Sequence, residues 1–238
     1  MIAGKIFARF VRPHRQDSRI LVGFLGLAGA MFVLIKLASE VAEGDTFAFD
    51  KAVLRGLRTT QDAAVPIGPA WLKSAMIDFT ALGGAPVLSL ITILAVGYLL
   101  AVRKLSTAIF VTLSVTCGAL LSALIKSLFV RPRPEIVSHL VEVNSTSFPS
   151  GHAMNSAIVY LTIAVLLARS QAKRRVQIYL IVAAMLLVLI VGSTRVFLGV
   201  HWPSDVMAGW TVGALWAAIC SLAAKTLQKE KRIEAPAA

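Results

Sequence analysis

The sequence VQIYLIVAAMLLVLIVGSTRVFLGVHWPSD, residues Val176–Asp205, joins a long apolar run to a group of polar residues. Its first part, Val176–Thr194, has the composition and nearly the length of a helix that crosses a bilayer, for which about 20 apolar residues are needed. The run ends at Arg195, and His201 and Asp205 follow shortly after it. The stretch therefore predicts a membrane-spanning helix with reactive side chains close to one end.

Five further stretches have the same apolar character. The 238 residues are 57% hydrophobic and only 15% charged, whereas soluble domains carry about 25% charged residues. We therefore expect an all-α fold, a polytopic membrane bundle with six transmembrane helices. The predicted spans are Ile20–Ile35, Phe79–Val102, Leu105–Ile125, Ala153–Ala168, Val176–Thr194 and Val206–Ala224.

Most of the cations precede the first span or follow the second, fourth and sixth spans. With six spans, 15 of the 24 Lys and Arg fall on the same face, together with both termini. The positive-inside rule makes that face cytoplasmic. These cations are Lys5, Arg9, Arg12, Arg15, Arg19, Arg103, Lys104, Arg169, Lys173, Arg174, Arg175, Lys225, Lys229, Lys231 and Arg232. We expect a bacterial inner membrane protein whose polar motifs face the periplasm.

The chain is predicted to be one membrane-embedded domain, residues 1–238, with a basic cytoplasmic leader at 1–19 and a cytoplasmic tail at 225–238. An alternative for the first span is a cleavable signal peptide, because a basic leader, an apolar core and small residues near 38–42 follow one another. The formal charge of +12 is placed to contact anionic lipid headgroups, not nucleic acid. The sequence predicts no oligomeric state.

The third motif along the chain, Arg195-x5-His201-x3-Asp205, has the residue types of a nucleophile and its partner. If a helix begins here, a spacing of four brings His201 and Asp205 to the same side. A carboxylate beside an imidazole fixes its tautomer and raises its basicity, which leaves the other ring nitrogen free to attack. The alternative is that His201 and Arg195 simply extend toward the interface.

The second motif, Pro149-Ser150-Gly151-His152, directly precedes an apolar run and is typical of a helix N-terminus. Backbone N–H groups and the helix dipole bind anions there, and Gly151 permits close approach of a phosphate. Ser150 can donate a further hydrogen bond or serve as an ordinary N-cap. His152 is placed to protonate a leaving oxygen.

The first motif, Lys126-x6-Arg133-Pro134, supplies two more cations. Lys126 ends the third span, and the flanking prolines stiffen the loop that carries Arg133. Arginine suits bidentate phosphate recognition, and lysine acts as a point charge. We expect Arg131, one proline away, to be a lipid-headgroup contact or an exposed charge.

Together the three motifs resemble the signature of the type 2 phosphatidic acid phosphatase (PAP2) superfamily, which includes bacterial lipid phosphate phosphatases and the vanadium haloperoxidases. The resemblance implies His201 as the nucleophile that forms a phosphohistidine, with Asp205 as its partner and His152 as the general acid. It implies that Lys126, Arg133, Ser150, Gly151 and Arg195 bind the phosphoryl oxygens. Thr194 stands where the family usually has Ser, and its hydroxyl is retained.

The predicted function is metal-independent hydrolysis of a membrane lipid phosphate or pyrophosphate, of the phosphatidic acid, phosphatidylglycerophosphate or undecaprenyl pyrophosphate type. No cofactor is predicted, because no Cys/His set or acidic cluster has metal-ligand spacing. Two alternatives stay open: a lipid phosphotransferase with the same intermediate, and a non-catalytic protein that binds anionic lipid. A haloperoxidase would need vanadate and does not suit this membrane topology.

Two features lie outside the motifs. A helix is expected near residues 50–59, because Phe49, Val53, Leu54 and Leu57 follow helical spacing. It either lies in the interface, where it guides a lipid to the site, or packs as a cap on the bundle. The sequence Gly83-Gly84-Ala85-Pro86 indicates a break or tight turn near the start of the second span.

Overall fold

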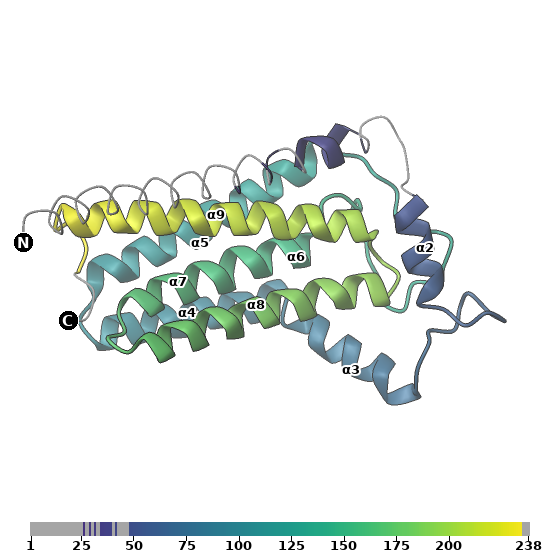
Figure 1. The fold of residues 1–238 in the computed structure, drawn as a ribbon, viewed down its shortest axis with the longest axis horizontal. Helices are drawn as coiled ribbons and strands as arrows, with labels where there is room; N and C mark the ends of the chain where they lie inside the picture. Colours follow the sequence, from purple (N-terminus) through teal and green to yellow (C-terminus); the bar gives the residue numbers. More distant parts are fainter. Residues whose placement is uncertain are drawn as a thin grey trace, which may run out of the picture.

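The computed structural model describes residues 48–234 and, before them, residues 26, 29, 31, 34–39 and 41. Its regular elements in this part are helical, and no strand is present among them. They are α2 (Ala48–Gly56), α3 (Ala70–Ala81), α4 (Ala85–Ala101), α5 (Leu105–Ser127), α6 (Gly151–Ser156), the π-helical turn η1 (Ala157–Leu161), α7 (Thr162–Arg169), α8 (Arg174–Phe197) and α9 (Pro203–Lys229). The all-α fold is as predicted (Figure 1).

Four helices of the described part are long and apolar enough to cross a membrane: α5, the continuous run Gly151–Arg169, α8 and α9. A fifth span is formed if α3 and α4, which meet at 52°, count as one broken helix. The predicted first span, Ile20–Ile35, lies mostly outside the described residues. The described part therefore carries four or five of the six predicted spans.

The bend between α3 and α4 lies where the Gly83-Gly84-Ala85-Pro86 sequence predicts a break. Pro86 lies in the first turn of α4, where its missing N–H costs nothing. A Cβ added at Gly83 would lie 3.2 Å from the His152 side chain and would overlap Val191. Glycine is therefore required at the bend because α6 and α8 approach the backbone closely.

The run α6–η1–α7 is the most buried of the four spans and lies at the centre of the bundle (Figure 1). Gly209 and Gly213 of α9 face it as a GxxxG pair, which lets two backbones approach closely. A Cβ at Gly209 would lie 2.9 Å from the Ser150 carbonyl oxygen, and one at Gly213 would lie 2.9 Å from that of Met154. This close packing holds the start of α9 against the start of α6.

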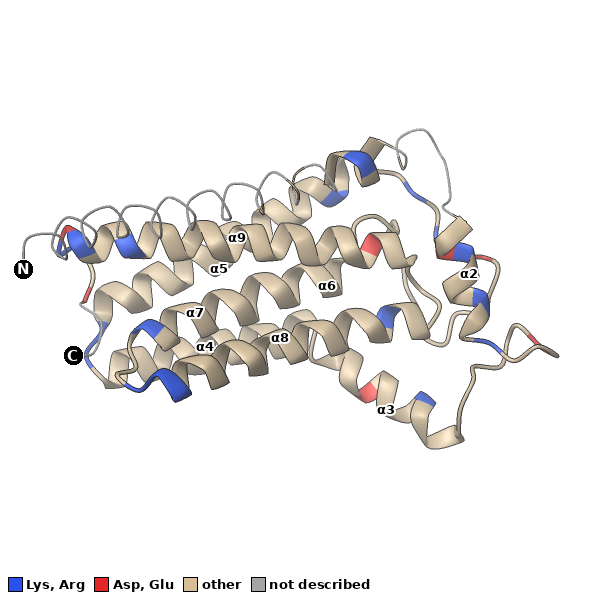
Figure 2. Cartoon of the chain, in the orientation of Figure 1, with Lys and Arg blue, Asp and Glu red and all other residues tan. Residues whose placement is uncertain are grey.

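The charged residues lie at the two ends of the bundle, and the middle of the helices is apolar (Figure 2). Cations gather where α7 joins α8 and where α9 ends, at the end away from α2. Many large apolar side chains on α4, α5 and α8 are exposed, including Ile93, Leu113, Leu120, Leu124 and Leu186. This apolar surface has the composition expected of a face in contact with lipid tails.

The C-terminal tail differs in one detail from the predicted solvated segment. Glu234 accepts hydrogen bonds from the backbone N–H groups of Ser106 and Thr107, at 2.9 and 2.8 Å, and from the Thr107 hydroxyl at 2.6 Å. Ile233 beside it is buried. The tail therefore caps the N-terminus of α5, where a carboxylate also interacts favourably with the helix dipole.

Candidate active site

The three motifs meet at the end of the bundle that α2 covers (Figure 1). Lys126 lies in the last turn of α5, the second motif begins α6, Arg195 lies in the last turn of α8, and Asp205 lies in the first turn of α9. His152 lies within electrostatic range of Lys126, Arg133, Arg195 and His201. All the predicted site residues thus belong to one cluster, although they come from four helices and two loops.

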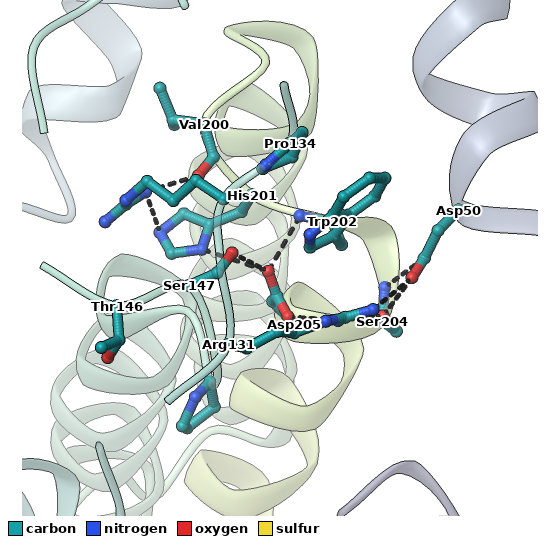
Figure 3. A network of polar contacts seen from close by, with 12 residues as sticks. Asp50, Arg131, Pro134, Thr146, Ser147, Val200, His201, Trp202, Ser204 and Asp205 are labelled. Carbon is teal, nitrogen blue, oxygen red and sulfur yellow. Dashed lines mark hydrogen bonds and ion pairs between the residues drawn. The ribbon is translucent and has the colours of Figure 1, made fainter. Parts of the chain in front are cut away.

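His201 and Asp205 form a pair at the start of α9 (Figure 3). Nδ1 of His201 lies 3.5 Å from Oδ2 of Asp205, which is longer than a normal hydrogen bond. Oδ2 of Asp205 also accepts the backbone N–H of Trp202 at 2.9 Å and the Ser147 hydroxyl at 2.5 Å. The carboxylate is therefore fixed on the Nδ1 side of the ring.

The other ring nitrogen of His201 faces Arg133. Nη1 of Arg133 lies 3.3 Å from Nε2 of His201, and a guanidinium can only donate. Nε2 therefore carries the lone pair, and the ring proton lies on Nδ1, toward Asp205. The lone pair points at the Arg133 guanidinium, which is the arrangement expected if His201 attacks a phosphorus atom whose oxygens lie against that cation.

Electrostatics keep this ring neutral. Burial lowers the pKa of His201 from 6.5 to about 4, with the nearby carboxylate of Asp205 opposing the shift and the cations Arg133 and Arg195 adding to it. Near pH 7 the imidazole is therefore unprotonated and able to act as a nucleophile.

The second motif is arranged differently from an ordinary cap. Ser150 occupies the N-cap position of α6, but its side chain makes no capping hydrogen bond. The hydroxyl is fully buried and has no hydrogen-bond partner among the described residues. A buried hydroxyl without a partner costs free energy, so this one is available to a bound group. A Cβ on Gly151 would lie 4.0 Å from Nζ of Lys126, so the glycine leaves room beside the lysine.

Three cations of the cluster are held by neutral oxygens. Nζ of Lys126 donates to the Thr146 carbonyl at 2.9 Å. Arg133 donates from Nε to the Ser145 carbonyl at 2.7 Å and from Nη1 to that of Val200. Nη1 of Arg195 donates to the Thr80 hydroxyl at 2.9 Å, and its buried Nε has no hydrogen-bond partner in the part of the chain that the structure describes.

None of these three cations, Lys126, Arg133 and Arg195, forms an ion pair with a carboxylate of the described residues. Their positive charge is therefore not neutralised locally, and the cluster favours an anion with several oxygens. No group of three or more His, Cys, Asp or Glu in the described part is placed to hold a metal ion.

The expectation for Arg131 was wrong. Only 5% of Arg131 is exposed, and its guanidinium joins two buried carboxylates, Asp50 at 3.0 Å and Asp205 at 2.5 Å. The residue is an internal ion-pair partner, because the loop after α5 folds inward between α2 and the start of α9. The ring of Trp202 lies 5.5 Å from the guanidinium carbon and covers its face.

Comparison with known proteins assigns the chain to a family. Residues 105–229 match the family model described as the PAP2 superfamily. The chain belongs to the PAP2 superfamily. The match covers α5 to α9 and contains all eight predicted site residues, so the resemblance inferred from the three motifs is confirmed.

Two relatives of this PAP2 protein are named as phosphatases. Phosphatidylglycerophosphatase B of Bacillus subtilis (strain 168) is 34% identical over 189 residues, which cover 78% of this chain and 87% of the relative. Undecaprenyl-diphosphatase of Sulfolobus acidocaldarius is 33% identical over 108 residues, which cover 44% of this chain and 45% of that protein.

Two solved structures have the same PAP2 fold. The crystal structure of a transmembrane PAP2 type phosphatidylglycerolphosphate phosphatase from Bacillus subtilis superposes with a TM-score of 0.70 and 28% identity, covering 83% of this chain and 96% of that one. The crystal structure of Aquifex aeolicus LpxE gives a TM-score of 0.55 and 25% identity, with coverages of 73% and 95%. The predicted membrane-bundle architecture is therefore confirmed.

Some polar residues of this PAP2 site were not anticipated from sequence: Asp50, Thr80 and Ser147. The position of Asp50 on the apolar face of its helix could have been read from the sequence. It lies four residues before Leu54, so both fall on one face of α2, and both are fully buried. An acidic residue on the apolar face of an amphipathic helix requires a buried partner.

The helix expected near residues 50–59 is α2, which ends at Gly56. Leu54 belongs to a buried apolar cluster with residues from two loops and three helices, namely Val137, Ala153, Val196, Trp202 and Val206. Phe49 on the same helix is exposed. Of the two alternatives for this helix, the contacts favour the cap on the bundle.

Proposed function

We propose that this protein is a membrane phosphatase that hydrolyses a lipid phosphate or pyrophosphate through a phosphohistidine on His201. The observation that carries the proposal is the orientation of the imidazole: Nδ1 faces Asp205 and Nε2 faces Arg133. The relatives named for hydrolysis of phosphatidylglycerophosphate and undecaprenyl diphosphate support the same reaction class.

In the first step, Nε2 of His201 attacks phosphorus in line with the leaving oxygen, and the P–O bond to the lipid breaks as the N–P bond forms. His152 donates its proton to the leaving oxygen. In the second step, water attacks the phosphohistidine, His152 takes a proton from that water, and phosphate leaves with His201 restored. Asp205 holds the Nδ1 proton and stabilises the positive charge that develops on the ring.

Charge stabilisation comes from Lys126, Arg133 and Arg195, with the Ser150 hydroxyl and the Gly151 backbone beside them. In phosphoryl transfer the negative charge spreads over three equatorial oxygens of the transition state. Fixed cations stabilise that charge most strongly in a site with little water. The three cations supply this charge at the proposed site without relying on a metal ion.

A lipid substrate is supported by a cavity of about 430 Å³ between α4, α5 and the α6–η1 run. Its walls are mostly apolar and include Leu88, Ile93, Val115, Ile158 and Val159. Asn155, which also lines it, comes one helical turn after His152. A headgroup at His152 would therefore place its first hydrocarbon segment at this cavity, within the apolar part of the bundle.

The proposal includes a location. The motif-bearing end of the bundle would face the periplasm of a bacterial inner membrane, with both termini in the cytoplasm and residues 1–238 forming one domain. The cations at the opposite end support this orientation, because cytoplasmic loops are rich in Lys and Arg.

The test is phosphate release by the purified full chain from phosphatidylglycerophosphate, phosphatidic acid and undecaprenyl pyrophosphate in detergent micelles. Radiolabelled lipid should leave an acid-labile label on the wild type, and His201→Ala should abolish both label and turnover. His139→Gln is the matched control, because the Nε2 of His139 contacts only the Pro134 carbonyl, at 2.8 Å. Wild-type turnover in His201→Ala would refute the nucleophile, and label transferred to a second lipid would identify a phosphotransferase instead.

A further inference from the structure

We propose that Asp50 and Arg131 are positioning residues that act on His201 through Asp205, by dividing one positive charge between two buried carboxylates. The inference rests on the proposed role of His201 as nucleophile. It adds α2, which carries no motif residue, to the parts of the chain that control the reaction.

The contacts form a closed network (Figure 3). Arg131 donates from Nη2 to Asp50 at 3.0 Å and from Nη1 to Asp205 at 2.5 Å. Asp50 also accepts the backbone N–H of Ser204 at 2.9 Å and its hydroxyl at 2.5 Å. The Ser204 hydroxyl in turn accepts from Nη1 of Arg131 at 2.8 Å. All four side chains are at least 95% buried.

This network fixes the first turn of α9. Ser204 and Asp205 are the second and third residues of that helix, and Asp50 satisfies one of its otherwise unpaired N–H groups. Asp205 contacts the His201 ring, and Asp50 accepts hydrogen bonds from Ser204, the residue before Asp205. A displacement of α2 would therefore move the carboxylate that orients the imidazole.

The charges matter as much as the positions. Asp50, Asp205 and Arg131 together carry one net negative charge. If Arg131 paired with Asp205 alone, the two would be neutral, and the positive charge that forms on His201 during attack would lose its counterion. Asp50 compensates Arg131 and leaves Asp205 effectively anionic toward the ring. The cost of one uncompensated charge is large in a buried site.

The charged and titratable groups that act on His201 are Asp205 from α9, Arg133 from the loop after α5, Arg195 from α8 and His152 from α6. None of these four side chains is substituted in variants of Asp50 or Arg131. A change of the His201 titration in such variants therefore reports the network.

The two single variants should shift the titration of His201 in opposite directions. Asp50→Asn removes a negative charge, so the imidazolium is less stabilised and the acid limb of kcat/KM moves to lower pH. Arg131→Gln removes a positive charge, so the limb moves to higher pH. In both, we expect kcat to fall about tenfold or more because the ring is misplaced, with KM changed less than about twofold.

The double variant Asp50→Asn/Arg131→Gln gives the decisive comparison. Of the three charged residues in the network, only Asp205 remains in this variant, so the net charge of −1 is the same as in the wild type. The acid limb of kcat/KM should therefore return close to the wild-type position, although kcat stays low. Ser204→Ala tests position without charge: kcat should fall and the acid limb should stay. Asp62→Asn, which removes an exposed carboxylate beyond α2, is the control and should change neither.

Histidine labelled with ¹³C at Cε1 reports the His201 titration directly by NMR of the full chain in micelles, independently of turnover. Titration shifts of the same sign in both single variants, or none in either, would overturn the inference, as would wild-type kcat in Ser204→Ala if the charge variants do not fold. Turnover by His201→Ala would refute the proposed function instead, so the two failures are distinguishable.

Discussion

The backbone N–H of Ser150 donates to the carbonyl oxygen of Asp205 at 3.0 Å. This bond joins the residue before α6 to the first turn of α9, and so connects the second motif to the third through the main chain. The same contact therefore helps to fix the positions of the expected general acid, His152, and the expected nucleophile, His201, relative to each other. Because the bond lies between backbones, side-chain changes in either motif can be tested without removing it.

Ser150→Ala separates a substrate contact from a structural cap. The buried hydroxyl makes no hydrogen bond with the described residues, so its loss should not lower the free energy of unfolding, while kcat/KM should fall about tenfold. Thermal unfolding in detergent and phosphate release measure the two effects. Ser156→Ala is the matched control. Its buried hydroxyl donates to the Ala153 carbonyl at 3.0 Å and is not one of the predicted site residues. Lost stability with full activity would assign Ser150 to structure.

Arg133→Lys tests whether the several N–H donors of a guanidinium are needed beside His201. Lysine keeps the charge but cannot reach the Ser145 carbonyl, the Val200 carbonyl and a phosphate together. We expect kcat/KM to fall about a hundredfold, and the stabilisation of the protein by orthovanadate or inorganic phosphate to weaken. Melting temperature against anion concentration measures the binding. Arg55→Lys, an exposed arginine on α2, should leave both quantities unchanged.

Acidification should destabilise the protein through His201. Its folded-state pKa is lowered from 6.5 to about 4, so the unfolded chain binds the proton first as the pH falls. Stability from this group is therefore complete above about pH 6.5 and lost progressively down to about pH 4, by roughly 3 kcal/mol. Comparing wild type with His201→Asn across this range isolates the effect. An equal pH dependence in both proteins would show that His201 does not contribute.

Gly213→Val should separate α9 from the central span. The added side chain would overlap Ala157 and approach the carbonyl oxygen of Met154 at 2.9 Å, and overpacking of this kind costs about 1–3 kcal/mol. We expect a lower melting temperature and reduced kcat, because α9 carries Asp205. Gly97→Val is the control, since nothing lies within 4 Å of a Cβ there. Unchanged unfolding of Gly213→Val would show that the close packing is not required.

The residues near each motif were sufficient to predict much of this site. Apolar runs of spanning length predict helices wherever they occur, because an unpaired backbone is costly in lipid. The break at Gly83 and Gly84 and the start of α9 at Pro203 depend on local conformational preferences, so they too could be predicted. The spacing of four predicted that His201 and Asp205 lie on the same side if a helix begins there, and the two side chains do meet, although His201 lies just before α9, which begins at Pro203.

The tertiary structure decided what lies behind those residues. Arg131 and Asp50 are 81 positions apart, and Arg131 and Asp205 are 74 apart. No local pattern distinguishes Arg131, a buried ion-pair partner, from Arg133, a cation of the site, although only one proline separates them. Which guanidinium faces inward depends on the packing of α2 and α9 around the loop, and a buried cation is stable only where the fold brings carboxylates to it.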